Sequence, residues 1–273
     1  MDFHILTIFP GFFSGFLDHG ILRRAIDTNR VHVHLHDLRA FTHDRHSTVD
    51  DRPFGGGEGM VLKAEPIAEA LAAIDIAPKS AREPGDIVIL LSAQGKSYSQ
   101  PLARRLAAPS ATAPRRIVLL CGRYEGVDER INDLYCDLEL SIGDYVLSGG
   151  ELAAAVIVDS VARLLPGVLG NEASGEFESF GPVDDEITTD IEGVPRSQHG
   201  SGGLLDYPHY TRPADFAGLA VPEVLLNGDH QQIRRWRREH QLLKTMRNRP
   251  ELLERAPLSR TDREFLAKIR QLD

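Results

Sequence analysis

The chain has 273 residues, of which 42% are hydrophobic and 26% are charged, and its formal net charge at pH 7 is −9. This composition is that of a soluble protein with one large or two ordinary domains. It argues against a membrane protein, since no apolar stretch approaches the roughly 18 residues of a membrane span, and against a protein that binds nucleic acid over its whole surface. The N-terminus has no basic, cleavable signal pattern, so we expect a cytoplasmic protein. Two cysteines, Cys121 and Cys136, are too few for a disulfide framework or a metal knuckle, and we expect small buried residues.

The charges are unevenly distributed along the chain. Residues 171–192 hold eight acidic side chains and no lysine or arginine, whereas residues 234–249 hold seven basic side chains and one acid, Glu239. A chain that separates its charges in this way can still attract a polyanion locally.

The N-terminal third alternates strands and helices. Residues 3–9 predict a buried strand, residues 12–28 a helix, and residues 31–36 a strand with three histidines on one face. A metal site and a solvated strand face both fit these imidazoles. The solvated face is favoured, because no carboxylate or cysteine stands nearby at metal-ligand spacing. Residues 41–60 form a long, glycine-rich loop for which we expect a flexible lid, whether or not it covers an active site.

A helix at 64–74, a strand at 87–91 and a helix at 99–107 follow. The sequence Gly-Lys-Ser at 95–97 resembles the end of a phosphate-binding loop, but the position that should hold the loop's first glycine is Leu90. No dinucleotide-type glycine pattern opens a helix either, which counts against a nicotinamide or flavin cofactor.

The chain is organised around residues 117–151, where two glycine-bearing loops each follow an apolar segment. Gly122 and Gly126 bracket the first loop, and the second runs from Gly143 to Gly150. Since glycine lets a ligand approach the main chain closely, the two loops look like the walls of one ligand site. Capping-box spacing at residues 148–151 predicts that a helix begins there and continues to about residue 165. Its N-terminus favours a carboxylate or phosphate.

The C-terminal third is predicted to be a separate helical domain. Residues 170–204 are acidic and lack apolar periodicity, so we expect a long linker. Asp229 can cap a helix with one apolar stripe, which leaves its arginines on a basic face toward solvent. Two interpretations fit this basic face: it is exposed to solvent only, or it contacts nucleic acid. The apolar stripe of the helix after Asp229 consists of Ile233, Trp236, His240 and Leu243. A last helix begins at about residue 259.

Four segments in this order resemble one family. They are residues 44–60, Cys-Gly-Arg-Tyr-Glu-Gly at 121–126, the loop 141–151 and Pro-His-Tyr-Thr-Arg-Pro at 208–213. The family is the bacterial tRNA (guanine-N1)-methyltransferases of the SPOUT superfamily, which act at position 37 beside the anticodon. The resemblance implies S-adenosylmethionine as methyl donor, tRNA as substrate and a homodimer. It also implies an α/β fold, in which a parallel-sheet domain at 1–169 binds the donor and ends in a trefoil knot. An acidic, flexible linker at 170–204 joins it to a small, mainly α-helical domain at 205–273 that binds tRNA.

The resemblance also implies roles for individual residues. Arg163 corresponds to the arginine that stabilises the guanine O6, although a charge that only compensates the helix dipole fits it as well. Glu178 stands where the family has the aspartate that acts as base from the second subunit; Asp184 and Asp185 are alternatives. The implied donor site consists of Ser92, Gly122, Tyr124, Glu125, Ile142, Gly143, Asp144, Tyr145, Val146, Leu147, Gly149 and Gly150.

Two further positions depart from the family pattern, since Glu58 and Ala93 stand where proline is usual. No metal ligands are implied, and the sequence leaves open whether a divalent cation such as Mg²⁺ takes part. Two other functions also fit the sequence: a methyltransferase of the same superfamily with a different RNA target, such as ribosomal RNA, and a non-catalytic RNA-binding relative.

Overall fold

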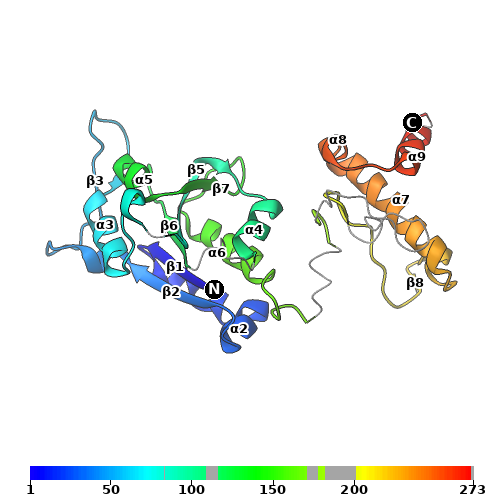
Figure 1. Ribbon diagram of the computed structural model, residues 1–273, viewed down its shortest axis with the longest axis horizontal. Coiled ribbons are helices and arrows are strands. Elements are labelled where there is room, and N and C mark those ends of the chain that lie inside the picture. The colour runs from blue at the N-terminus through cyan, green and yellow to red at the C-terminus, as the bar shows by residue number, and fades with distance from the viewer. Residues whose placement is uncertain (83, 109–115, 171–177, 182–200, 272–273) are drawn as a thin grey trace. The chain divides into compact units, whose positions relative to one another are not determined.

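The computed structural model describes residues 1–82, 84–108, 116–170, 178–181 and 201–271. The chain divides into two compact units, residues 1–170 and 171–273 (Figure 1). Within the described ranges, no helix combines the length and the apolar character that crossing a membrane requires.

The first unit is built on a five-stranded parallel sheet with the strand order β2-β1-β6-β5-β7. This arrangement confirms the predicted parallel α/β domain. The apolar residues of each central strand alternate between two buried clusters, so both faces of the sheet are covered, as is usual for parallel sheets. The strands are β1 (Asp2–Thr7), β2 (His32–Asp37), β5 (Asp86–Ser97), β6 (Arg116–Cys121) and β7 (Leu138–Ser141).

Helices cover the two faces unequally. Residues of α2 (Gly20–Asp27), α4 (Gln100–Ala107) and α6 (Glu151–Ala162) belong to one cluster. Residues of α3 (Ala64–Ala73) and α5 (Glu129–Tyr135) belong to the other. Both cysteines are buried and free, as expected. The remaining short elements of this unit are η1 (Pro10–Phe13), α1 (Ser14–Leu17), η2 (Leu38–Phe41), η3 (Lys79–Ala81) and the hairpin of β3 (Asp50–Asp51) and β4 (Val61–Leu62).

Two expectations for this unit need correction, and two of its elements were not predicted. The helix predicted at 12–28 is broken between α1 and α2, where His19 is extended and Gly20 has a φ of 66°. The strand predicted to end at residue 91 continues to Ser97, as β5. The short α5 and β7 were not predicted, because each has too few residues to show a period.

The second unit has a small core of its own, formed by Leu204, Leu242, Leu253 and Leu266. The described parts of the predicted linker belong to this unit. Phe180 N–H donates to the Leu204 carbonyl at 2.8 Å, and Gly181 N–H donates to Ser201 Oγ at 2.6 Å. The elements are β8 (Asp215–Phe216), β9 (Leu219–Ala220), η6 (Glu223–Leu225), α7 (His230–Asn248), α8 (Glu251–Arg255) and α9 (Arg260–Arg270).

Helix α7 begins as predicted, since the Asp229 carboxylate accepts hydrogen bonds from two backbone N–H groups of the first turn. Its buried face differs from the prediction, however. Arg238 is 7% exposed and pairs with Asp262 of α9 at 2.8 Å, so not every arginine of the helix faces solvent. Burial opposes ionisation of Asp262, but the Arg238 guanidinium outweighs it and lowers the pKa of that carboxyl. The predicted apolar stripe is only half-buried.

His4 of β1 stacks with His34 and His36 of the edge strand β2. The His4 ring lies 4.6 Å from that of His34 and 5.2 Å from that of His36, and the described residues hold no group of three or more ligands suited to a metal ion. Burial and the neighbouring imidazoles lower the pKa of His4 from 6.5 to about 4, and burial lowers the pKa of His36.

This cluster predicts loss of stability in acid. Between pH 6.5 and about 4 the unfolded chain binds a proton that folded His4 does not, so the free energy of unfolding falls as the pH is lowered through this window. We expect His4→Gln to flatten the fall in melting temperature between pH 7 and pH 4. The control His43→Gln replaces a histidine whose side chain is 82% exposed and should follow the wild-type curve; equal curves for all three proteins would contradict the prediction.

Candidate functional site

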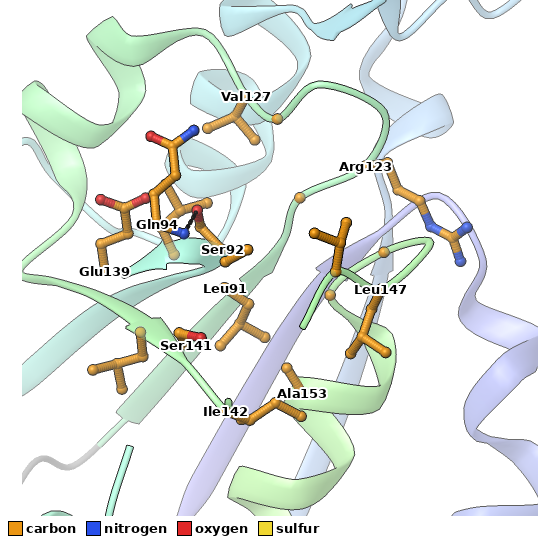
Figure 2. A pocket seen from close by; sticks show the side chains of 18 of the residues that line it. Leu91, Ser92, Gln94, Arg123, Val127, Glu139, Ser141, Ile142, Leu147 and Ala153 are labelled. Carbon is orange, nitrogen blue, oxygen red and sulfur yellow. Dashed lines mark hydrogen bonds between the residues drawn. The ribbon is translucent and has the colours of Figure 1, made fainter. Parts of the chain in front are cut away.

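A cavity of about 420 Å³ lies at the carboxyl ends of β6 and β7, beside a bulge within β5. Parallel sheets commonly bind ligands at this edge. Figure 2 shows side chains from three segments facing it. The structure brings eleven of the twelve predicted donor-site residues to the cavity, and Asp144 lies in the same loop without lining it. The eleven are Ser92, Gly122, Tyr124, Glu125, Ile142, Gly143, Tyr145, Val146, Leu147, Gly149 and Gly150.

The first wall is a bulge within β5. Leu91 and Lys96 both register with Leu140 of β7, so residues 92–95 leave the ladder and line the cavity up to Gln94. Ser92 Oγ accepts a hydrogen bond from the Gln94 N–H at 3.0 Å (Figure 2). A Cβ on Gly95 would lie 2.5 Å from the Leu140 nitrogen, so only glycine allows the strand to rejoin β7.

The second wall is the loop at 122–127, which turns through left-handed backbone at Tyr124, with a φ of 59°, and at Gly126, with a φ of 122°. The end of the glycine-rich lid docks on this loop. Glu125 N–H donates to the Met60 carbonyl at 3.0 Å, and Leu62 N–H donates to the Gly126 carbonyl at 3.0 Å. The lid predicted from the sequence is therefore anchored to the cavity at its C-terminal end.

The third wall is the loop at 142–150, which is held against the second by its glycines. Gly150 N–H donates to the Gly122 carbonyl at 2.9 Å, and Gly149 forms an antiparallel bridge with Arg123. A Cβ on Gly150 would lie 2.7 Å from the Cys121 Cα. Close packing of main chain on main chain is thus what requires glycine here, and the backbone of Gly150 is in ordinary helical conformation.

Arg123 and Glu151 fasten these two loops together, and we call them the Arg123–Glu151 latch. The guanidinium and the carboxylate lie 2.9 Å apart, and the Glu151 side chain is 2% exposed. Thr7 Oγ1 of β1 donates to the same carboxylate at 2.6 Å, and Arg123 Nη1 donates to the Ser148 carbonyl at 3.0 Å. Arg123 also lines the cavity, so the side chain that fixes the two loops forms part of the cavity wall.

The latch overturns one expectation from the sequence. Ser148 to Glu151 has the spacing of a capping box, but α6 begins after Gly150 and has no side-chain cap. The Glu151 carboxylate is bonded to Arg123 and Thr7 instead, a use that spacing alone cannot distinguish from capping. Arg123 itself was missed, although its position between two glycines of the central stretch marked it as a loop residue.

The described lining of the cavity combines apolar and polar side chains. Apolar side chains of Leu91, Ile142, Leu147 and Ala153 face it beside the polar Gln94 (Figure 2). No cysteine, histidine or lysine is present among the described residues that line it. Cys121, at the end of β6, is 1% exposed and does not line the cavity, and burial raises its pKa well above the usual value.

The two predicted catalytic residues do not line this cavity. Arg163 caps the C-terminal end of α6, about 15 Å along the helix axis from Ala153 on the cavity wall. Glu178 belongs to the second unit, where its carbonyl accepts a hydrogen bond from Gly181 N–H at 3.1 Å. The alternatives Asp184 and Asp185 lie outside the described residues.

The latch predicts a large cost for removing its charge. In Glu151→Gln the Arg123 guanidinium, 19% exposed, loses its ionic partner, and we expect a loss of about 3 kcal/mol in the free energy of unfolding. Urea unfolding measures this loss. Asp27→Asn, which removes one partner of an exposed pair with Arg23, is the matched control and should cost less than about 1 kcal/mol. Similar costs for the two variants would show that the latch is not a buried ion pair.

The amino-acid sequence of this chain is similar to those of one family of known proteins. Residues 1–255 match the family model described as tRNA (Guanine-1)-methyltransferase TrmD. A tRNA (guanine-N(1)-)-methyltransferase of Koribacter versatilis is 55% identical over 270 residues, which cover 99% of this chain and 98% of that protein. Proteins of the same name from Geobacter metallireducens and Chloroflexus aggregans are 44% and 48% identical, and the matches cover 99% and 98% of this chain and 98% and 95% of theirs.

Proposed function

Since the chain belongs to the tRNA (guanine-N1)-methyltransferase family, we propose that S-adenosylmethionine is its methyl donor and that guanosine 37 of tRNA is its target. The enzyme transfers a methyl group to N1 of a guanine in tRNA. The observation that carries the assignment of a donor site is the three-walled cavity, in which eleven residues implied by the resemblance lie together. The tRNA substrate supports a location in the cytoplasm.

The residues of the cavity suit this donor. Leu91, Ile142 and Leu147 offer apolar surface to an adenine ring, while the backbone of the glycine loops offers polar groups to the ribose and the amino-acid part. The donor supplies an electrophilic methyl group on a sulfonium. A cavity without a cysteine, histidine or lysine nucleophile among its described lining residues fits direct transfer, in which the protein itself carries no methyl group.

We assign the proton chemistry to Glu178 and Arg163. The guanine N1 carries a proton that must leave as the nitrogen becomes a nucleophile, and a carboxylate at Glu178 can accept it. Negative charge then grows on O6, where the Arg163 guanidinium can stabilise it. A tRNA loop guanine has to be unstacked before both groups can reach its edge.

A transfer assay tests donor and target together. The chain incubated with donor labelled in its methyl group and an unmodified tRNA transcript should place label on N1 of guanosine 37. A transcript with adenosine at position 37 should remain unlabelled. Label at another guanosine would contradict the target, and transfer that requires a different donor would contradict the cavity's assignment.

We also propose that the active site is completed in a homodimer. Leu152 and Val156, on the exposed side of α6, are 50% and 44% exposed, an apolar face that a second copy could cover. Within one chain, α6 separates Arg163 from the cavity, which supports a site built from two chains. The family's trefoil knot is part of the same proposal, supported by the close backbone approaches at Gly95 and Gly150.

Mixing two inactive variants tests the shared site. If arginine and carboxylate come from different subunits, a heterodimer of Arg163→Ala and Glu178→Gln chains contains one intact site. Subunits exchanged at random should then regain about a quarter of wild-type activity, although each variant alone is nearly inactive. No recovery, with dimers present by light scattering, would assign both groups to one subunit.

A further inference from the structure

The second unit contains a cavity that the transfer reaction does not use. It measures about 360 Å³ and lies between the segment 207–214, residues 221–226 and the first turns of α7. Its walls belong to one compact unit, so the cavity is present in a single chain. Aromatic and basic side chains line it, and no acidic side chain does so among the described residues.

The aromatic wall has the arrangement of a stacking platform. The ring centroids of Tyr210 and Trp236 lie 6.2 Å apart at an interplanar angle of 60°. His240 stacks on the Trp236 ring at 3.8 Å and 23°, which fixes the orientation of the indole. Tyr210 is 50% exposed, so its ring is accessible from the cavity mouth. A planar group that enters this cavity would contact the Trp236 ring, which His240 holds in place, and the half-exposed Tyr210 ring at the cavity mouth.

The two arginines of the cavity are not paired with acidic side chains among the described residues, whereas His209 is paired with Asp206 at 2.9 Å. Arg237 lies over the Tyr207 ring, 4.9 Å from its centroid. In the part of the chain that the structure describes, no carboxylate lies within ion-pair distance of Arg237 or of Arg212. Neighbouring arginines of α7 differ, since Arg235 pairs with Glu239 and Arg238 with Asp262. The positive charge left at the cavity is therefore available to an anionic ligand.

We propose that this cavity binds one unpaired base of the tRNA, stacked on Trp236 and Tyr210, with adjacent phosphates at Arg212 and Arg237. The proposal rests on tRNA being the substrate, and it adds a second anchoring point to the proposed methylation site. Stacking on aromatic rings combined with backbone contacts to arginine is how proteins hold single-stranded nucleic acid. A purely phosphate-binding groove would not need the two rings, and an apolar peptide would leave both arginines desolvated and unpaired.

The sole tryptophan of the chain makes this cavity directly observable, because Trp236 supplies all of the indole fluorescence. Titrating the full-length wild-type protein with unmodified tRNA, and separately with a short single-stranded oligonucleotide, should quench this emission to saturation. An abasic oligomer of the same length carries the phosphates without bases and should quench little. Equal quenching by both oligomers would overturn the stacking of a base in favour of phosphate binding alone.

Two substitutions with matched controls complete the test. Tyr210→Ala and Arg237→Gln should each weaken tRNA binding about tenfold, raising KM for tRNA with little change in kcat. Phe216→Ala replaces an aromatic residue that is 72% exposed and does not line the cavity. Arg235→Gln replaces an arginine that lies two residues before Arg237 in α7 and is paired with Glu239. Both variants should bind tRNA like wild type.

The outcomes separate this inference from the methylation site. If wild type methylates tRNA but the emission of Trp236 stays constant on binding, the base-binding cavity is wrong and the proposed function stands. If RNA quenches the emission but no methyl group is transferred, the proposed function fails and the cavity stands. Saturating quench by a proline-rich peptide, with none by RNA, would reassign the cavity to a protein partner.

Discussion

Glu178→Gln is expected to lower kcat for methyl transfer by about 10²–10⁴-fold, because an amide cannot accept the proton of guanine N1. Affinities for donor and tRNA should stay near wild type, since the three-walled cavity and the second unit keep their contacts. Single-turnover transfer, with enzyme in excess over labelled tRNA, measures the chemical step directly. Binding of both substrates should be measured alongside.

The matched substitution is Glu178→Asp, which keeps the carboxylate and restores the residue found at this position in the family pattern. It should retain far more activity than Glu178→Gln, because it keeps a group that can accept the proton. Asp184→Asn and Asp185→Asn should leave the rate unchanged. A full rate in Glu178→Gln together with a large loss in either aspartate variant would move the base to that aspartate.

Gly150→Ala is expected to abolish donor binding at concentrations that saturate wild type. The added methyl group would lie 2.7 Å from the Cys121 Cα and 3.1 Å from both the Gly122 nitrogen and the Leu91 Cβ. Two of these are backbone atoms, so the loops at 122–127 and 142–150 must separate, and the hydrogen bond from Gly150 N–H to the Gly122 carbonyl is lost. Isothermal titration with the donor measures the affinity. We also expect a cost of about 1–3 kcal/mol in stability from overpacking.

Gly15→Ala is the control for this substitution. Gly15 lies in α1, and its added Cβ would have no atom within 4 Å, so donor affinity should be unchanged. Donor binding by Gly150→Ala at wild-type strength would mean that the two loops do not need their close contact to form the site.

The sequence was most informative where chemistry requires a particular backbone. Gly122 and Gly150 indicated the cavity loops from the sequence alone, because glycine is required where main chains approach closely. The apolar runs likewise predicted β1, β5 and β6, whose residues are buried on both faces of the sheet. The parallel α/β domain followed from these elements and from the resemblance together.

What could not be predicted depends on partners distant in sequence. Glu151 fits a capping box equally well, and only the positions of Arg123 and Thr7 show that its carboxylate is used elsewhere. Arg238 looked like a solvent-exposed cation, because the Asp262 that buries it lies on another helix. Trp236 looked like part of a core stripe, yet it lines a cavity. Local periodicity carries no information about such pairings.

The latch also constrains how the enzyme is made. Its hydrogen bond from Thr7 to Glu151 joins residues that are 144 positions apart, so this bond cannot form until nearly the whole first unit has been synthesised. Contacts with such large sequence separation form slowly, since the entropy of closing the intervening loop is lost before they can compensate for it. A ribosome-bound chain that ends before α6 therefore lacks the latch that fastens the two glycine loops together. Any stabilisation by the donor acts only on the completed, folded unit.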